Sequence, residues 1–269
     1  MRIGHRNFDT RSHAHVMGIL NVTPDSFSDG GRFAALDDAL RRCGEMIAQG
    51  AAIIDVGGES TRPGYTPVSV QEEIDRVCPV IETICRRFDV PVSVDTRKSA
   101  VAKAALAAGA VMVNDIEGLK GDPAMAKAIA DADAACCIMH NRAEARYDDL
   151  MRDVIADLSG SIAIARAAGI REDGIMLDPG VGFAKSFEEN LSVTRQVSKL
   201  LALGYPVLLG TSRKSMIGLA LDLPKDQREE GTLATTVYGV MNGVSFFRVH
   251  DVQANVRAIA MTQAILNAR

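Results

Sequence analysis

Short apolar runs alternate with segments of helical periodicity along the chain from residue 16 onward. The first apolar run, residues 16–22, gives way to turn-forming residues such as Pro24 and Gly30. Short apolar runs with such boundaries are typical of strands that are covered on both faces. The expected strands lie within residues 16–22, 53–56, 91–95, 111–115, 134–140, 175–180, 206–215 and 244–251.

Helices are expected between these strands. Leu36, Leu40 and Cys43 recur on one helical face after the first strand. Ser69 and Ser186 are each followed by Glu three residues later, a capping-box pattern that predicts a helix start. Further helices are expected near residues 98–108, after 122–123, and over 149–168, 186–203 and 229–241, with Asp251 capping a last helix.

Eight strand-then-helix units in a row predict an α/β fold and a single domain over residues 1–269. Strands that are nearly all apolar and β-branched are characteristic of parallel sheets. Eight such units favour a closed (β/α)8 TIM barrel over an open doubly wound sheet, with the active site at the C-terminal ends of the strands. No linker or change in composition suggests a second domain.

The composition argues against some classes of partner. The net charge is −4 and the pI is near 5.8, whereas nucleic-acid and membrane-surface partners require a basic patch. We therefore expect no nucleic-acid and no membrane partner. The sequence shows no secretory signal and no spanning segment, so we expect a cytoplasmic protein. Its five cysteines lack CxxC spacing and are expected to be buried, reduced thiols.

Polar, turn-forming residues follow the first strand. Asn21 stands at the tip of that strand, and the stretch from Pro24 to Gly31 cannot extend it. This stretch is expected to form a mobile loop over the strand tip. The loop is either a lid over a site or an ordinary solvated connection, and the local sequence leaves both possibilities open.

A polar residue follows nearly every apolar run, at the end where a barrel enzyme carries its chemistry. We expect these residues to converge on one mouth. Each could also be a helix cap or a turn former, and Asp55 and Asp115 in particular could be only that. The residues at the expected strand tips are Asn21, Asp55, Asp95, Asn114, His140, Asp178, Thr211, Ser212, Arg213, Lys214, Arg248 and His250.

Three of these residues, Asp95, Asn114 and Asp178, supply two carboxylates and an amide. Lys214 is the one basic partner expected beside them. Such groups suit the amino-pyrimidinone edge of a planar heterocycle, because a carboxylate accepts two parallel N–H bonds and an amide both donates and accepts. Two carboxylates could instead bind a metal or transfer protons, but no His with ligand spacing joins them. Ligand recognition is favoured, and metal binding remains the alternative.

A second group of residues at the mouth is cationic. Cations combined with neutral donors suit a multiply charged oxyanion, which an acidic protein would otherwise repel. Mg²⁺ usually bridges phosphate oxygens while taking few protein ligands, and Asn21 is a candidate ligand. The group consists of Arg62, Arg213, Lys214, Arg248 and His250, with Asn21, Ser60 and Thr61 as neutral donors.

Three other patterns are assigned structural roles. His13 and His15 precede the first strand and are therefore expected at the opposite end of the barrel. Residues 180–186 contain a Lys-Ser pair but lack the glycines that a phosphate-binding loop requires. The charged residues between Arg142 and Asp149 are expected to form an exposed loop.

Several stretches in the chain match the pattern of a known family: MGILNVTPDSFSDGG (17–31), DVGGESTRPG (55–64), SVDT (93–96), NDI (114–116), LDPGVGF (177–183), GTSRKS (210–215) and RVHD (248–251). In these stretches the chain resembles the dihydropteroate synthases, the folate-pathway enzymes that sulfonamides inhibit. It departs from the family pattern at Ala184, where Gly is usual, and after the fifth strand, where MHNRAEA (139–145) replaces a Met-His-Met with a nearby Gly-x-Pro.

This resemblance implies a TIM-barrel transferase with Mg²⁺ as cofactor and a homodimeric assembly. The implied reaction joins 6-hydroxymethyl-7,8-dihydropterin pyrophosphate to p-aminobenzoate by dissociative substitution at the pterin methylene. Loops at 21–33 and 58–67 would close over the pyrophosphate. The implied catalytic residues are Asp95, Asp178, Lys214, Arg248 and His250. By position, Asp95, Asn114, Asp178 and Lys214 bind the pterin; Asn21, Thr61, Arg62, Arg248 and His250 bind the pyrophosphate, with Asn21 on the metal; and Thr61, Pro63, Phe183, Arg213 and Ser215 bind p-aminobenzoate.

Two alternatives would share the pterin pocket. A pterin-binding barrel methyltransferase would have no use for the stretches at 60–64, 210–215 and 248–251. A non-catalytic pterin-binding paralogue, acting as a carrier, should lack the loop residues that this chain keeps.

Overall fold

The structure is a computed structural model that describes residues 1–22, 31–59 and 67–268. Within them, eight parallel strands form one sheet in the order β8-β7-β6-β5-β4-β3-β10-β9. A parallel bridge between Leu177 and Val207 brings β8 beside β9, so the sheet closes into a barrel. The strands are β3 (His15–Asn21), β4 (Ile53–Gly57), β5 (Val92–Asp95), β6 (Met112–Asp115), β7 (Ala135–Met139), β8 (Ile175–Asp178), β9 (Leu208–Leu209) and β10 (Phe246–Val249).

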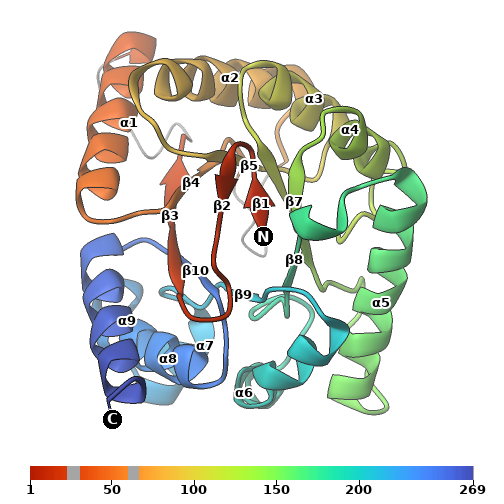
Figure 1. The fold of residues 1–269 in the computed structure, drawn as a ribbon, viewed down its shortest axis with the longest axis vertical. Helices are drawn as coiled ribbons and strands as arrows, with labels where there is room; N and C mark the ends of the chain where they lie inside the picture. Colours follow the sequence, from red (N-terminus) through yellow and green to blue (C-terminus); the bar gives the residue numbers. More distant parts are fainter. Residues whose placement is uncertain (23–30, 60–66, 269) are drawn as a thin grey trace.

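Helices surround this barrel on its outside (Figure 1). They alternate with the strands along the chain, as parallel pairing requires. All eight expected strands are present, and the predicted TIM barrel is confirmed. The helices are α1 (Gly31–Ala48), α2 (Val70–Arg87), α3 (Ser99–Ala107), α4 (Met125–Asp131), α5 (Leu150–Ala168), α6 (Phe187–Arg195), α7 (Ser215–Leu221), α8 (Glu229–Met241) and α9 (Val252–Leu266), with 3-10 helices η2 (Glu172–Gly174), η3 (Val197–Leu203) and η4 (Lys225–Gln227).

Alternate side chains of each strand face opposite sides of the barrel wall. On β3, Val16 and Leu20 pack outward in the large core beneath the helices. Met17 faces inward, where it joins a smaller core inside the barrel. On β4, Ile53 also faces inward, so Asp55, two positions later, points into the interior as well. Strand parity therefore directs specific polar residues toward the barrel axis.

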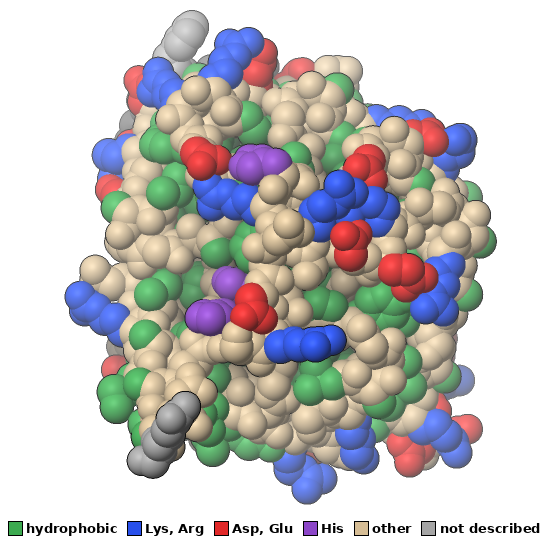
Figure 2. All heavy atoms as spheres, in the orientation of Figure 1, with side chains coloured by type: hydrophobic (Ala, Val, Ile, Leu, Met, Phe, Trp, Pro, Cys, Tyr) green, Lys and Arg blue, Asp and Glu red, His purple; other side chains and the backbone are tan. Residues whose placement is uncertain are grey.

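A two-stranded hairpin, β1 (Arg2–Ile3) and β2 (Arg6–Asn7), covers the N-terminal end of the barrel. Ile3 and Phe8 are buried against Phe246 and other inward-facing residues at the strand starts. The sequence did not predict this hairpin. Figure 2 shows the same end of the molecule, where acidic and basic side chains are interspersed. Because the hairpin blocks this end, ligand access must be sought at the opposite end.

His15 begins β3 and lies at the closed end of the barrel, as the sequence predicted. Its ring centroid is 5.0 Å from that of Phe8 and 5.3 Å from that of Phe246. The Nε2 atom lies 2.9 Å from the backbone oxygen of Asp9. His15 therefore supports the packing of the hairpin.

Several local expectations are corrected by the structure. Gly31, expected in a loop, is the first residue of α1, and the rest of that loop, residues 24–30, lies outside the described residues. The helix expected over 186–203 divides into α6 and η3. Cys85 is exposed and Cys78 half-buried, whereas Cys43, Cys136 and Cys137 are buried as expected; all five are free thiols.

Candidate active site

The C-terminal ends of four neighbouring strands place polar residues at one level of the barrel. Asn21 on β3 pairs in register with Gly57 on β4, Gly57 with Asp95 on β5, and Asp95 with Asn114 on β6. A Cβ atom added to Gly57 would lie 3.5 Å from Asn21 Oδ1 and 3.7 Å from Asp95 Oδ2. Glycine therefore leaves space between the amide and the carboxylate.

Arg248 on β10 lies between two carboxylates inside the barrel. Its Nε donates to Asp55 Oδ2 and its Nη2 to Asp95 Oδ2, both at 2.6 Å, and Asn114 Nδ2 donates to Asp55 Oδ2 at 3.2 Å. The expectation that only Lys214 stands near the acidic residues is therefore wrong. Asp55 is also more than a cap or turn former, because it is fully buried and balances the guanidinium charge.

Asp115, by contrast, is the turn former that the sequence suggested. Its carboxylate accepts hydrogen bonds from the backbone N–H groups of Glu117 and Leu119 at 2.9 and 2.7 Å. The contrast with Asp55 follows from strand parity, which points Asp55 into the barrel.

Asp95 retains one acceptor that no described residue uses. Its Oδ1 atom is buried and has no hydrogen-bond partner among the described residues, while Oδ2 accepts from Arg248. Burial raises the pKa of Asp95, although the Arg248 guanidinium opposes this shift. Leaving a buried acceptor unpaired costs stability. We infer that Oδ1 is kept for a donor that a ligand supplies.

Asp178 at the end of β8 provides the second carboxylate. Its Oδ1 accepts from the backbone N–H of Gly180 at 2.7 Å. A Cβ atom on Gly210 would lie 3.5 Å from Asp178 Oδ2 and 4.0 Å from Lys214 Nζ, so the two groups lie beside the same glycine. Burial raises the pKa of Asp178 and lowers that of Lys214 to about 8, and their mutual attraction opposes both shifts.

Lys214 connects the mouth to the loop that follows β8. Its ammonium group donates to the backbone oxygen of Val181 and lies 4.8 Å from the centroid of the Phe183 ring. A cation over an aromatic face is attracted by the ring quadrupole. Phe183 and Lys214, predicted for neighbouring subsites, are therefore in contact.

His250 is held at the end of β10 by Ser212. The Ser212 hydroxyl accepts from the His250 backbone N–H at 3.2 Å and lies 2.9 Å from the ring Nδ1. If the hydroxyl donates to Nδ1, the neutral ring carries its proton on Nε2. The sequence predicts Ser212 at a strand tip, but nothing local to it indicates this contact with His250.

Arg213 is already paired in the structure. Its guanidinium makes bidentate contact with Asp251, with Nη2 2.8 Å from Oδ1 and Nε 3.1 Å from Oδ2. Asp251 occupies the position before α9, but its side chain does not cap that helix. The expected capping role of this side chain is therefore wrong, and Asp251 orients Arg213 instead.

The remaining predicted residues do not all join this arrangement. Ser215 begins α7 and is exposed at the surface. His140 follows β7 but turns away from the mouth, because its Nε2 lies 3.0 Å from Asp157 on the outer helix α5. The predictions for Ser60, Thr61, Arg62 and Pro63 fall outside the described residues.

The donor groups at the mouth fit a magnesium ion that is bound mainly through a substrate. Among the described residues, no three His, Cys, Asp or Glu side chains gather as a metal site. Asn21 offers one neutral oxygen beside the space that Gly57 leaves. Mg²⁺ often takes only one or two protein ligands and completes its shell with phosphate oxygens and water.

Comparisons with known proteins agree with this geometry. The family described as pterin binding enzymes matches residues 17–250. A dihydropteroate synthase from Clostridium beijerinckii is 54% identical over 267 residues, which cover 99% of each chain.

Solved structures show the same relationship. The dihydropteroate synthase of Clostridium difficile, crystallised in the presence of pteroic acid, superposes with a TM-score of 0.95 at 50% identity and covers 97% of this chain and 100% of its own. The dihydropteroate synthase of Xanthomonas albilineans with 4-aminobenzoic acid superposes with a TM-score of 0.91 at 42% identity. This match covers 96% of the present chain and 94% of the Xanthomonas chain. The chain therefore belongs to the pterin-binding enzymes and, within them, to the dihydropteroate synthases.

Proposed function

We propose that this chain joins 6-hydroxymethyl-7,8-dihydropterin pyrophosphate to p-aminobenzoate, forming 7,8-dihydropteroate and releasing pyrophosphate. The observation that carries the proposal is the pair of buried carboxylates at one mouth, with Asp95 Oδ1 unpaired among the described residues and Asp178 beside Lys214. Carboxylates suit the N–H groups of a pterin edge, and Lys214 suits a ring oxygen or nitrogen acceptor. Asn114 completes the polar lining.

The proposed reaction is a dissociative substitution. The bond between the pterin methylene and the pyrophosphate oxygen breaks, and its electron pair leaves with the pyrophosphate. The amine lone pair of p-aminobenzoate then forms the new C–N bond, and the amine loses a proton. The cationic pterin between these steps is stabilised by Asp95 and Asp178, because fixed negative charges in a buried site stabilise developing positive charge.

Arg248 and His250 are proposed to hold the departing pyrophosphate. Arg248 is positioned beside the pterin pocket by Asp55 and Asp95, and His250 by Ser212. Asn21 would hold Mg²⁺, which when bound neutralises negative charge on the pyrophosphate. Thr61 and Arg62 belong to the same proposed subsite on the basis of the family resemblance alone.

The p-aminobenzoate is proposed to bind where Phe183 and Lys214 meet. Phe183 offers an aromatic face, and Arg213, oriented by Asp251, offers a cation toward the carboxylate of the substrate. Thr61, Pro63 and Ser215 complete this proposed subsite by resemblance.

A homodimer is proposed through the outer surface of α7, α8 and α9. The packing of α7 on α8 and of α8 on α9 brings these helices together on one side of the barrel (Figure 1). Large exposed apolar surfaces are uncommon on monomers and mark interaction sites. The exposed apolar side chains of these helices are Leu219, Leu221, Tyr238, Met241, Met261, Ile265 and Leu266.

We also propose a cytoplasmic location. All five cysteines are free thiols, which is typical of a reducing compartment. Within the described residues, no helix is both long enough and apolar enough to cross a membrane.

An assay of pyrophosphate release tests the proposed reaction. Purified protein should release pyrophosphate only when pterin pyrophosphate, p-aminobenzoate and Mg²⁺ are all present. Tight pterin binding without any release would favour the non-catalytic alternative. Transfer of a methyl group from a methylated folate would favour the methyltransferase.

A further inference from the structure

The loop between β8 and α6 holds one residue, Ala184, in a backbone conformation that alanine does not favour. Three of its residues have positive φ angles: Gly180 at 69°, Gly182 at 85° and Ala184 at 43°. Glycine adopts such angles without penalty, whereas the Cβ atom of alanine disfavours them. Ala184 directly follows Phe183, whose ring contacts Lys214. Contacts that hold the backbone at Ala184 therefore offset this penalty.

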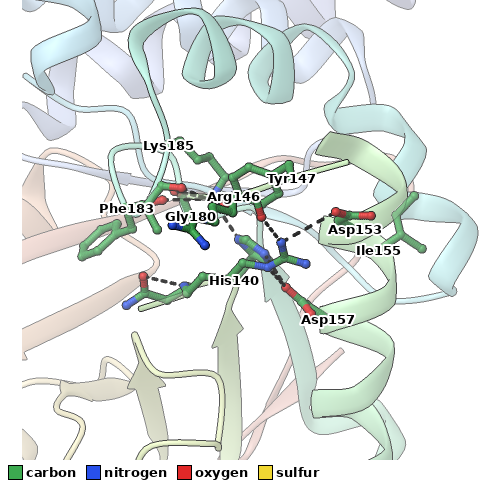
Figure 3. A network of polar contacts seen from close by, with 12 residues as sticks. His140, Arg146, Tyr147, Asp153, Ile155, Asp157, Gly180, Phe183 and Lys185 are labelled. Carbon is green, nitrogen blue, oxygen red and sulfur yellow. Dashed lines mark hydrogen bonds and ion pairs between the residues drawn. The ribbon is translucent and has the colours of Figure 1, made fainter. Parts of the chain in front are cut away.

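Lys185 secures one side of this loop from within. Its Nζ donates to the backbone oxygens of Gly180 and Phe183 at 3.0 and 3.1 Å and lies 2.9 Å from His140 Nδ1. An ammonium group only donates, so His140 Nδ1 accepts and the ring proton sits on Nε2, facing Asp157. Figure 3 shows this chain of contacts from α5 to the loop.

Tyr147 reaches the strained residue itself. Its hydroxyl donates to the backbone oxygen of Ala184 at 2.7 Å. Burial raises the pKa of Tyr147 to about 12, so the hydroxyl keeps its proton at neutral pH. Tyr147 comes from the segment after β7 and not from the loop that it contacts.

The position of Tyr147 is fixed in turn by Arg142. The Arg142 guanidinium lies 4.6 Å from the centroid of the Tyr147 ring, and its Nε donates to Asp157 on α5 at 2.6 Å. Arg142 also donates to the backbone oxygen of Arg146. The prediction of an exposed charged loop is therefore wrong for Arg142, which is half-buried and anchors this segment to α5.

We propose that Tyr147 is a positioning residue for the p-aminobenzoate subsite, because its hydroxyl holds the left-handed backbone at Ala184 and thereby sets the place of Phe183 against Lys214. This inference rests on the proposed function. Tyr147 itself need not touch either substrate. Its influence reaches the subsite through the peptide next to Phe183.

The test combines Tyr147→Phe with Ala184→Gly. Tyr147→Phe should raise the KM for p-aminobenzoate about fivefold, the effect of losing one hydrogen bond, while kcat and the KM for the pterin substrate change by less than about twofold. Ala184→Gly removes the penalty at residue 184, so the double variant should recover most of the loss. Tyr205→Phe is the matched control, because the Tyr205 hydroxyl accepts from Arg166 Nη2 at 2.9 Å, away from this loop and from the proposed dimer surface.

Calorimetry separates failure of this inference from failure of the proposed function. The probes are pteroic acid, which carries the aminobenzoate half, and 6-hydroxymethylpterin, which does not. Tyr147→Phe should weaken only pteroic acid. Wild-type protein that binds neither probe would refute the proposed function. If the wild type binds both probes and Tyr147→Phe binds each probe as tightly as the wild type does, the positioning role alone is overturned. A loss that Ala184→Gly does not reverse would also overturn it.

Discussion

Arg248 Nη2 lies 2.6 Å from Asp95 Oδ2, so the cation assigned to the departing anion is in direct contact with the carboxylate assigned to the pterin. The two halves of the site are therefore not separate. In the proposed reaction, one guanidinium would therefore contact both the departing pyrophosphate and a carboxylate that stabilises the pterin cation.

The first prediction concerns Arg248→Ala. Loss of the guanidinium should weaken pyrophosphate binding at least tenfold, since hydrogen bonds to charged groups are the strong ones. The affinity for pteroate, which lacks the pyrophosphate, should fall less. Calorimetry with both ligands measures the difference. Arg248→Lys keeps a charge and should retain part of the affinity, whereas equal losses for both ligands would refute the assignment.

The second prediction concerns Asp178→Ala. Removing this buried carboxylate deprives Lys214 of a nearby negative charge and the proposed pterin of an acceptor. Pterin affinity should fall at least about a hundredfold, an effect expected for a lost charged hydrogen bond in a buried site. Asp178→Asn preserves the shape of the side chain, and its pterin affinity should fall less. Unchanged affinity in calorimetry would remove Asp178 from the pterin site.

The third prediction concerns Ser212→Ala. Without the hydroxyl, His250 loses one contact that orients its ring, and pyrophosphate inhibition should weaken about fivefold. Ser212→Thr retains the hydroxyl and serves as the control. Inhibition constants for pyrophosphate provide the measurement, and similar values for the alanine variant and the wild type would contradict the positioning of His250 by Ser212.

The fourth prediction is a loss of stability in mild acid. Burial, with Lys185 nearby, lowers the pKa of His140 to about 4. The unfolded chain takes up this proton near pH 6.5, so between pH 6.5 and 4 it holds more protons than the folded state. Stability should therefore fall as the pH decreases through that window, by up to about 3 kcal/mol.

Urea unfolding at pH 7 and pH 4.5 measures this effect. His140→Gln removes the titrating group and should reduce the difference between the two pH values. An identical pH dependence in wild type and variant would assign the acid sensitivity to other groups.

The fifth prediction concerns the apolar surface of α7 to α9. Leu219 on α7 is 66% exposed and Met241 on α8 is 62% exposed. Leu219→Asp together with Met241→Asp should convert the dimer to a monomer in sedimentation velocity, because a charge is costly to bury in an interface. Ile164→Asp on α5 is a control outside this surface. A wild-type monomer at micromolar concentration would refute the proposed dimer.

The sequence was sufficient for the parts of the fold that depend on local patterns. The apolar runs located every barrel strand, and the capping box at Ser186 and Glu189 forms as predicted. Ser69 likewise caps α2 by accepting from the Glu72 backbone. These features depend on residues a few positions apart, so periodicity and spacing suffice to predict them.

Contacts between distant residues were the ones that the sequence did not predict. Arg248 and Asp55 are 193 positions apart, and nothing near either residue specifies their pairing. A signal for Asp55 did exist, because a charge within a short, otherwise apolar strand must find a partner when buried. Arg213 and Asp251 pair in the same non-local way, whereas the position of Asp251 before α9 predicts only a helix cap.

The N-terminal hairpin closes one end of the barrel, where Ile3 and Phe8 are buried, and the proposed reactive end lies opposite. If the protein were attached to a biosensor surface through this closed end, the opposite end of the barrel would face the solution that carries the ligand. Immobilised protein could thus report the binding and release of ligands in real time, because its attachment point would be remote from the side chains at the mouth.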